Sequence, residues 1–326
     1  MNHSALRRAK SGDKVLEIKN LSVAYGQRTV VEDVSFRVLA GETVSIVGES
    51  GSGKSTILRA VQGLLGSEGR IVSGSITFDG VSLPDLKPDE MRRYRGGVIA
   101  TVPQQAGLSM DPITRIGRQF CEAIRTQRKI TQNESDARAC ECMRSLSLKE
   151  PEKILRSYPA MLSGGTNQRV ALALAMVMEP RLILADEPTS ALDVTVQVEV
   201  VRSMLELKRQ SDAAILMVTH NMGVVAQMSD HVGVMYNGRL LEWGTRDGVL
   251  HTPRHPYTRA LMASVLKMDG SVPDVKTVYR EAAVGGCIYY SRCPFAEDGC
   301  RAAQKTIDAD GHMVMCCRAG EVTANA

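Results

Sequence analysis

The sequence predicts an α/β protein built around a phosphate-binding loop. Residues 48–56, Gly-Glu-Ser-Gly-Ser-Gly-Lys-Ser-Thr, fit the pattern Gly-x-x-x-x-Gly-Lys-[Ser/Thr] in full. The segment before them, Thr43–Val47, reads as a buried strand, and Thr56–Leu65 reads as a helix, which is the context that this motif requires. Two further apolar runs, Leu182–Glu187 and Ala213–Thr219, read as buried strands that end in polar residues.

The glycines of this loop explain how it could hold a polyphosphate. Gly48, Gly51 and Gly53 let the backbone bend so that several N–H groups converge, and the following helix adds its positive end. Lys54 supplies a mobile charge for the β- and γ-phosphates, and the Ser55 hydroxyl is placed to bind magnesium. The predicted nucleotide-binding residues of the loop are Gly48, Glu49, Ser50, Gly51, Ser52, Gly53, Lys54, Ser55 and Thr56.

Composition excludes several functional classes. The 326 residues are 44% apolar and 23% charged, as in an ordinary globular protein. Lysine and arginine exceed the acidic residues by only 40 to 36, and 4% of residues are aromatic. The charge balance is too mild, and the aromatic residues too scattered, for a nucleic-acid-binding surface. The length allows one large domain with an extension, or two modest domains.

No membrane-spanning segment or leader is expected. A spanning helix needs roughly 20 apolar residues, and the best candidate, Val170–Met178, is short and closed by Arg169 and Glu179. Residues 1–13 are polar and basic, so they predict a disordered tail and neither a signal peptide nor an anchor. The chain should therefore stay in the cytoplasm, where its eight cysteines are not expected to form a disulfide framework.

The first part of the chain reads as a series of strands. Val15–Lys19 alternates apolar and charged residues, and Leu21–Tyr25 follows it. Two short strands, Val30–Val31 and Val34–Val38, precede the phosphate loop, and Ile71–Gly80 reads as a strand and a turn after it.

A strand-like run, Val98–Val102, leads into Pro103, Gln104 and Gln105. An amide at the end of such a strand can reach magnesium and the attacking water. Gln104 is the better aligned of the two glutamines, but the pattern leaves the choice between Gln104 and Gln105 open.

The pattern becomes helical and polar from Ile116 to about Leu146, which suggests an all-helical insert. We assign no function to its three cysteines, because free cysteine is commonly a small buried hydrophobe; they are Cys121, Cys140 and Cys142.

A second anion site is predicted at Ser163, Gly164 and Gly165, just before the helix Val170–Met178. Because one protein rarely needs two triphosphate cradles, this site is expected to face the nucleotide held by a partner subunit.

Carboxylates and a histidine follow the apolar strands. Asp186 and Glu187 end Leu182–Glu187, and a buried carboxylate is costly unless it meets a cation, so Asp186 is assigned to magnesium. Glu187 is then placed to act on the water that attacks the γ-phosphate. His220 follows Ala213–Thr219 and can hydrogen-bond the γ-phosphate. The predicted catalytic set is Lys54, Gln104, Glu187 and His220, and the predicted magnesium ligands are Ser55, Gln104 and Asp186.

Together these motifs resemble the ATP-binding subunits of ABC transporters, from about Leu16 to His251. The resemblance implies a RecA-like core, an antiparallel β subdomain and an α-helical subdomain at about 113–178. It implies that Tyr25 stacks on adenine. It also implies that the segment Ser190–Asp193 lies beside the nucleotide and that Asp193 is its nucleotide-binding residue. It also implies that two such domains close head to tail on ATP and drive a pair of membrane subunits. The signature departs from the usual form at Thr166, where glutamine is common.

The tail carries a narrower resemblance to oligopeptide and dipeptide importers, through Glu242–Thr245 and Pro253–Leu261. It implies an ATPase domain at 14–252 and a cysteine-bearing C-terminal extension at 253–326. Such extensions are associated with an iron–sulfur cluster of the [4Fe–4S] type, for which four thiolates is the right ligand count. Zinc would accept the same sulfurs, and reduced cysteines are the third alternative. The candidate ligands are Cys287, Cys293, Cys300 and Cys316, with Cys317 as an alternative to Cys316.

The resemblance implies an ATP-hydrolysing subunit that energises an importer for peptides or similar small polar solutes. It implies two transmembrane permease subunits, a homologous ATP-binding subunit, an external solute-binding protein, and a peripheral location at the cytoplasmic face of the membrane. Relatives with this tail also serve nickel chelates, glutathione, opines and sugars. An exporter subunit, or an ATPase acting on ribosomes or nucleic acid, is less favoured; the latter usually carries two ATPase cassettes, whereas this chain has one phosphate loop and one signature.

Overall fold

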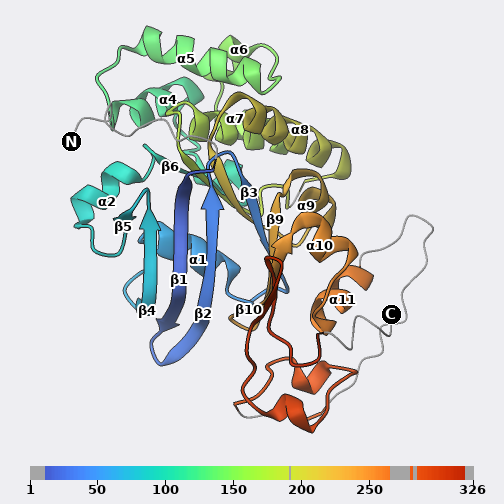
Figure 1. The fold of residues 1–326 in the computed structure, drawn as a ribbon. Helices are drawn as coiled ribbons and strands as arrows, with labels where there is room; N and C mark the ends of the chain where they lie inside the picture. Colours follow the sequence, from blue (N-terminus) through green and yellow to red (C-terminus); the bar gives the residue numbers. More distant parts are fainter. Residues whose placement is uncertain (1–11, 191, 265–279, 282–284, 320–326) are drawn as a thin grey trace.

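The computed structural model describes residues 12–190, 192–264, 280–281 and 285–319. Within them, two β-sheets lie against each other, and a group of helices caps one end (Figure 1). The described residues beyond 252, called here the C-terminal unit, lie toward the other end (Figure 1). Residues 1–11, most of the predicted disordered tail, lie outside the described part.

A four-stranded antiparallel sheet forms the first layer, in the order β2, β1, β4, β5. It corresponds to the predicted antiparallel β subdomain. The predicted pair of short strands at 30–38 is one continuous strand, which stays paired with β1 on both sides of Asp33. Asp33 takes a positive φ of 54°, and its carboxylate accepts from the Asn20 amide at 2.7 Å. The strands are β1 (Lys14–Tyr25), β2 (Arg28–Leu39), β4 (Gly69–Phe78) and β5 (Val81–Ser82).

The second sheet has eight strands in the order β11, β12, β10, β9, β3, β8, β7, β6. Its centre is parallel from β9 to β6, and β3 and β8 are buried at every position, as expected of parallel strands covered on both faces. The carboxyl ends of β3, β6, β7 and β8 therefore meet at one edge. The strands are β3 (Thr43–Val47), β6 (Ile99–Val102), β7 (Leu182–Asp186), β8 (Ala214–Val218), β9 (His231–Tyr236), β10 (Arg239–Thr245), β11 (Ile307–Ala309) and β12 (His312–Val314).

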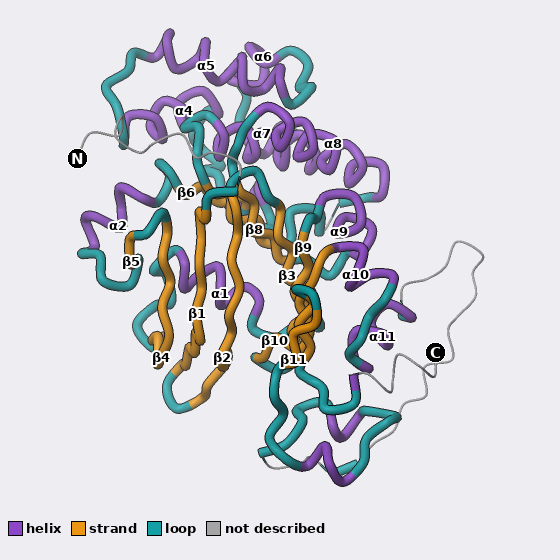
Figure 2. The backbone as a smooth tube through the Cα atoms, in the orientation of Figure 1, coloured by secondary structure: helices purple, strands orange, loops and turns teal. Residues whose placement is uncertain are grey.

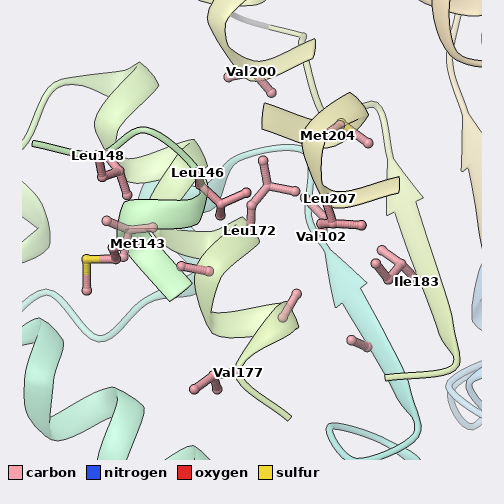
Figure 3. Close-up of a cluster of buried hydrophobic side chains, with 14 of the residues drawn as sticks. Val102, Met143, Leu146, Leu148, Leu172, Val177, Ile183, Val200, Met204 and Leu207 are labelled. Atoms are coloured by element: carbon pink, nitrogen blue, oxygen red, sulfur yellow. The ribbon is translucent and has the colours of Figure 1, made fainter. Parts of the chain in front are cut away.

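The predicted all-helical insert is present, and α4, α5 and α6 group beside α7 and α8 (Figures 1 and 2). Their apolar faces share a core with β6 and β7, and Met143, Leu172, Val102 and Ile183 all belong to it (Figure 3). Burial of this apolar surface fixes the helices against the eight-stranded sheet. The helices are α2 (Pro88–Tyr94), α3 (Ala106–Ser109), α4 (Ile116–Arg125), α5 (Gln132–Ser145), α6 (Pro151–Arg156), η2 (Pro159–Met161), α7 (Gly164–Met176), α8 (Val194–Gln210) and α9 (Met222–Met228).

Two helix predictions were wrong at their ends. The helix after the phosphate loop is α1 (Lys54–Val61), which starts and ends earlier than Thr56–Leu65. Helix α7 begins at Gly164 and not at Val170, because the Ser163 side chain caps it by accepting from the Thr166 N–H at 3.2 Å.

The C-terminal unit joins the large sheet through β12, which pairs antiparallel with β10 (Figure 1). The buried Glu242 carboxylate on β10 holds it: the N–H groups of Arg254 and His255 donate to it at 2.7 and 2.9 Å, and His312 Nε2 lies at 2.7 Å. These contacts keep the pKa of Glu242 low although burial opposes its charge. The remaining elements are α10 (Arg246–His251), α11 (Pro256–Ala263), η3 (Tyr290–Arg292) and η4 (Asp298–Arg301).

In the part of the chain that the structure describes, no helix combines the length and the apolar character needed to cross a bilayer.

Candidate active site

The phosphate loop connects β3 to α1 and is wrapped around the Lys54 ammonium group. This group donates to the backbone carbonyls of Gly48 and Glu49 at 2.9 and 2.8 Å and to Ser52 Oγ at 3.3 Å. Burial lowers the pKa of Lys54, and the charges of Glu187 and Asp186 oppose that shift. The side chain is thus a buried cation at the start of a helix.

Glycine is required at two places in this loop. Gly48 has a φ of 147°, and a Cβ there would lie 2.1 Å from the Met235 carbonyl oxygen. Gly53 has a φ of 98°, and a Cβ there would lie 2.8 Å from the Val30 carbonyl oxygen. The loop backbone therefore packs directly on β2 and β9, which fixes its shape.

Ser55 and Asp186, which lie 131 positions apart in the sequence, meet at the edge of the sheet. The Ser55 hydroxyl donates to Asp186 Oδ1 at 2.9 Å. Burial raises the pKa of Asp186, although the bond from Ser55 opposes this shift. A hydroxyl and a partly buried carboxylate in contact are ligands of the kind that magnesium takes, so these two residues fit the predicted metal site.

Three of the predicted catalytic side chains form one hydrogen-bonded row. Gln104 Nε2 donates to Glu187 Oε2 at 3.1 Å, and His220 Nδ1 lies 3.1 Å from Glu187 Oε1. Glu187 itself has a positive φ of 45° directly after β7, a backbone conformation that is uncommon outside glycine and that often occurs at functional sites. The structure thus brings together Gln104, Glu187 and His220, which follow the ends of β6, β7 and β8. Gln104 donates its hydrogen bond to the Glu187 carboxylate.

The predicted second anion site lies at the start of α7. The Ser163 hydroxyl is shared between the Thr166 N–H and the Thr166 hydroxyl, at 3.2 and 2.9 Å. Thr166, the residue that departs from the usual signature, thus steadies Ser163. Gly165 packs so closely on α8 that a Cβ would lie 2.2 Å from Val196 Cγ1. Asp193 caps α8 by accepting from the Val196 N–H at 3.0 Å.

Tyr25 ends β1, and its ring lies close to the backbone of Gly69, where a Cβ would be 2.9 Å from Tyr25 Cε1. The Tyr25 hydroxyl oxygen is buried and has no hydrogen-bond partner among the described residues. Its predicted stacking on adenine stays a prediction.

The four candidate cysteine ligands of the C-terminal unit line one small cavity with room for about one water molecule, about 10 Å³. Burial raises the pKa of Cys293 to about 11 and also raises the pKa of Cys287 and of Cys316. Among the described residues, no group of three or more histidine, cysteine, aspartate and glutamate side chains is arranged to hold a metal ion. The donor type fits an iron–sulfur cluster, whereas the arrangement of the thiols in this structure does not.

The alternative ligand, Cys317, is exposed, and its sulfur lies 3.7 Å from Cys300 Sγ. Cys316, in contrast, is buried and lines the cavity.

Comparison with known proteins agrees with this architecture. The ABC transporter family matches residues 31–190, and the oligopeptide/dipeptide transporter C-terminal region matches residues 241–300. The chain is 40% identical over 257 residues to the metal-staphylopine import system ATP-binding protein CntD of Staphylococcus aureus, which covers 78% of this chain and 94% of that protein. The chain belongs to the ATP-binding subunits of ABC transporters.

Other relatives place it in the oligopeptide/dipeptide group of that family. It is 38% identical to the oligopeptide transport ATP-binding protein OppD of Haemophilus influenzae, over 89% of this chain and 93% of that protein. It is 35% identical to the dipeptide transport ATP-binding protein DppD of Escherichia coli, over 93% of this chain and 96% of that protein. The predicted family and its narrower subgroup are thus confirmed.

A solved relative confirms the fold. The ATP-binding cassette MJ0796, whose dimeric post-hydrolysis structure holds ADP and Pi, matches with a TM-score of 0.62 at 27% identity, over 71% of this chain and 98% of that one. The chain is accordingly an ABC-type ATPase subunit, in which ATP hydrolysis is coupled to transport.

Sequence reasoning missed two residues that contact the phosphate loop, Tyr257 and Arg292. The Tyr257 hydroxyl accepts from the Glu49 N–H at 3.0 Å, and Arg292 pairs with the Glu49 carboxylate. Tyr257 lies in the tail segment that carried the narrower resemblance, but no local pattern indicates that either side chain returns to the loop.

Proposed function

We propose that this subunit energises the import of short peptides or similar small polar solutes, with the Gly48–Thr56 loop, Asp186 and Glu187 as its ATP-hydrolysing centre. The observation that carries the proposal is the meeting of Ser55, Asp186 and Glu187 at the carboxyl edge of β3 and β7, beside a buried lysine. The names of OppD and DppD, together with the matching C-terminal region, support peptides as the solute class.

The proposed chemistry is positioning and charge neutralisation. Lys54 and the loop N–H groups would hold the phosphates, and Ser55 and Asp186 would hold magnesium, which neutralises charge on the transferred phosphoryl group when bound. Glu187 would orient the attacking water, and its bonds to Gln104 and His220 keep its carboxylate at the end of β7. His220 would also reach the γ-phosphate.

The domain division belongs to the proposal as well. We assign ATP hydrolysis to residues 14–252, with the helical subdomain at about 113–178, and a separate extension to residues 253–326. Ser163, Gly164 and Gly165 would contact the ATP held by a homologous subunit, with Asp193 beside them and Tyr25 on the adenine.

The proposed assembly contains two transmembrane permeases and a homologous ATP-binding subunit at the cytoplasmic face of the membrane, fed by an external solute-binding protein. Co-purification from detergent-solubilised membranes tests it. Recovery of two permeases and a second ATP-binding subunit is expected, whereas recovery of ribosomes would contradict it.

One pair of variants tests the hydrolytic centre. Lys54→Ala should lose ATP binding, whereas Glu187→Gln should bind ATP and hydrolyse it about 10²- to 10⁴-fold more slowly, the range for losing a positioned base. Titration with Mg·ATP measures the binding, and phosphate release from the purified complex measures the hydrolysis. Unchanged turnover in Glu187→Gln would remove Glu187 from its proposed role.

A second candidate solute class has a specific observation behind it. CntD, which is named for metal-staphylopine import, is 40% identical to this chain, slightly more than OppD or DppD. Stimulation of the complex's ATPase activity by a peptide-loaded or a metal-chelate-loaded binding protein separates the two.

An iron–sulfur cluster at Cys287, Cys293, Cys300 and Cys316 stays a prediction. The four side chains line one cavity, which supports the prediction. The cavity has room for about one water molecule, so the four thiols would have to move apart to bind a cluster. Iron and sulfide determination after anaerobic purification tests the prediction, and Cys293→Ser, which removes one candidate ligand, is the control. A metal-free protein of full stability would contradict the cluster. Zinc without sulfide would favour the alternative metal.

A further inference from the structure

The C-terminal unit contacts the phosphate loop at Glu49. Arg292 Nη1 lies 3.0 Å from both oxygens of the Glu49 carboxylate, and the Tyr257 hydroxyl accepts from the Glu49 N–H at 3.0 Å. The two partners lie 243 and 208 positions beyond Glu49 in the sequence. A loop residue next to Gly48 is thus held, at both its backbone and its side chain, by residues outside the sheet that carries the loop.

Arg292 is held in place by an aromatic cluster. The rings of Tyr236, Tyr257 and Tyr289 lie 4.7 to 5.3 Å apart, centroid to centroid. The Arg292 guanidinium lies 5.8 Å from the Tyr236 ring and 6.0 Å from the Tyr289 ring. Contact with two ring faces stabilises a guanidinium in one position and limits its loss of side-chain freedom on pairing. Arg292 is therefore presented to Glu49 by a packed surface, unlike an ordinary surface arginine.

The charge of Glu49 makes this pairing relevant to ATP. A carboxylate in a phosphate loop repels a nucleotide that carries several negative charges, and the repulsion between like charges acts over several ångströms. Arg292 neutralises the carboxylate and holds it toward the C-terminal unit. The bond from the Glu49 N–H to Tyr257 fixes the peptide at the same position.

We infer that Arg292 is a positioning residue for ATP binding, which acts by neutralising Glu49 and holding it toward the C-terminal unit. The inference rests on the proposed role of the Gly48–Thr56 loop in holding the phosphates. It gives the C-terminal unit a direct part in the nucleotide site, in addition to its packing on β10.

A calorimetric titration of the purified full-length chain with Mg·ATP tests the inference. Arg292→Met keeps the aliphatic stem over the tyrosine rings and removes the charge. We expect it to raise the Kd about two- to fivefold, the effect of a partly exposed ion pair. Arg292→Lys should restore most of the affinity. Arg301→Met, which removes an exposed arginine of the same unit that lies over Tyr290 and pairs with Asp298, is the matched control and should leave the Kd unchanged.

A second-site variant separates positioning from simple structural support. If Arg292 acts through the charge of Glu49, Arg292→Met should have no effect in a Glu49→Gln background. A loss of the same size in both backgrounds, or an unchanged Kd in Arg292→Met alone, would overturn the inference. Failure of the proposed function looks different, because Lys54→Ala would then bind Mg·ATP as tightly as the parent chain.

Discussion

Replacing Glu242 by glutamine should destabilise the whole chain, because this carboxylate joins the C-terminal unit to the sheet. Its side chain is 0% exposed and accepts from the N–H groups of Arg254 and His255, while His312 Nε2 lies at 2.7 Å. Glutamine keeps the shape but has only one accepting oxygen. The NH₂ group of the glutamine would take the place of one carboxylate oxygen and face an N–H group that needs an acceptor. The site is buried, so water cannot supply that acceptor.

The cost follows from these contacts. One buried donor left without an acceptor costs about 1–3 kcal/mol, and the remaining bonds lose the extra strength that a charged acceptor gives. Together they predict a loss of about 2–5 kcal/mol in the free energy of unfolding. In a chain of this size the melting temperature should fall by about 3–7 °C.

Thermal unfolding of the purified chain, followed by circular dichroism at neutral pH, measures the effect. Glu32→Gln is the matched control, because Glu32 pairs with Arg239 at a position where the Glu32 side chain is 49% exposed. The control should cost less than about 1 kcal/mol. A Glu242→Gln protein that melts within 1 °C of the parent would show that the charge of Glu242 is not what holds the C-terminal unit on the sheet.

Two further predictions concern the loop and the effect of pH. Gly48→Ala should abolish Mg·ATP binding, because its Cβ would lie 2.1 Å from a backbone oxygen of Met235; retained binding in a calorimetric titration would contradict this. Burial lowers the pKa of His255 to about 4. In the unfolded chain the imidazole binds a proton below about pH 6.5, whereas in the folded chain it stays neutral down to about pH 4. The free energy of unfolding should therefore be highest above about pH 6.5 and should decrease as the pH falls toward 4. Chemical unfolding at several pH values should show this loss, and His255→Asn, which keeps an acceptor for the Tyr257 N–H, should reduce it.

The parts of the fold that sequence predicted best are those set by local patterns. Thr43–Val47 is a strand because every residue is apolar or small and buried on both faces. Asp186 and Glu187 could be placed at a sheet edge because they end an apolar run. The break in the helical insert was not predicted, although Thr131 and Glu134, which form a capping box at the start of α5, give it a local signal.

What sequence could not predict depends on contacts between distant segments. The pairing of β12 with β10 joins residues about 70 positions apart, and its short strand has no periodicity of its own. The bonds from Tyr257 and Arg292 to Glu49 likewise leave no local pattern, because tertiary packing alone brings them together. At 30–38 the polar residues of the bulge at Asp33 were mistaken for a break between two strands.

We expect the Gly48–Thr56 loop of this chain to hold Mg·ATP while Ser163–Gly165 completes the site of a neighbouring subunit. A structure of the Glu187→Gln transporter complex with Mg·ATP would show both contacts at once. We predict that Ser55 and Asp186 bind the metal and that the N–H groups of Ser163–Gly165 contact the γ-phosphate held by the neighbouring subunit. A complex in which Ser163–Gly165 stays away from every neighbouring nucleotide would rule out this shared site.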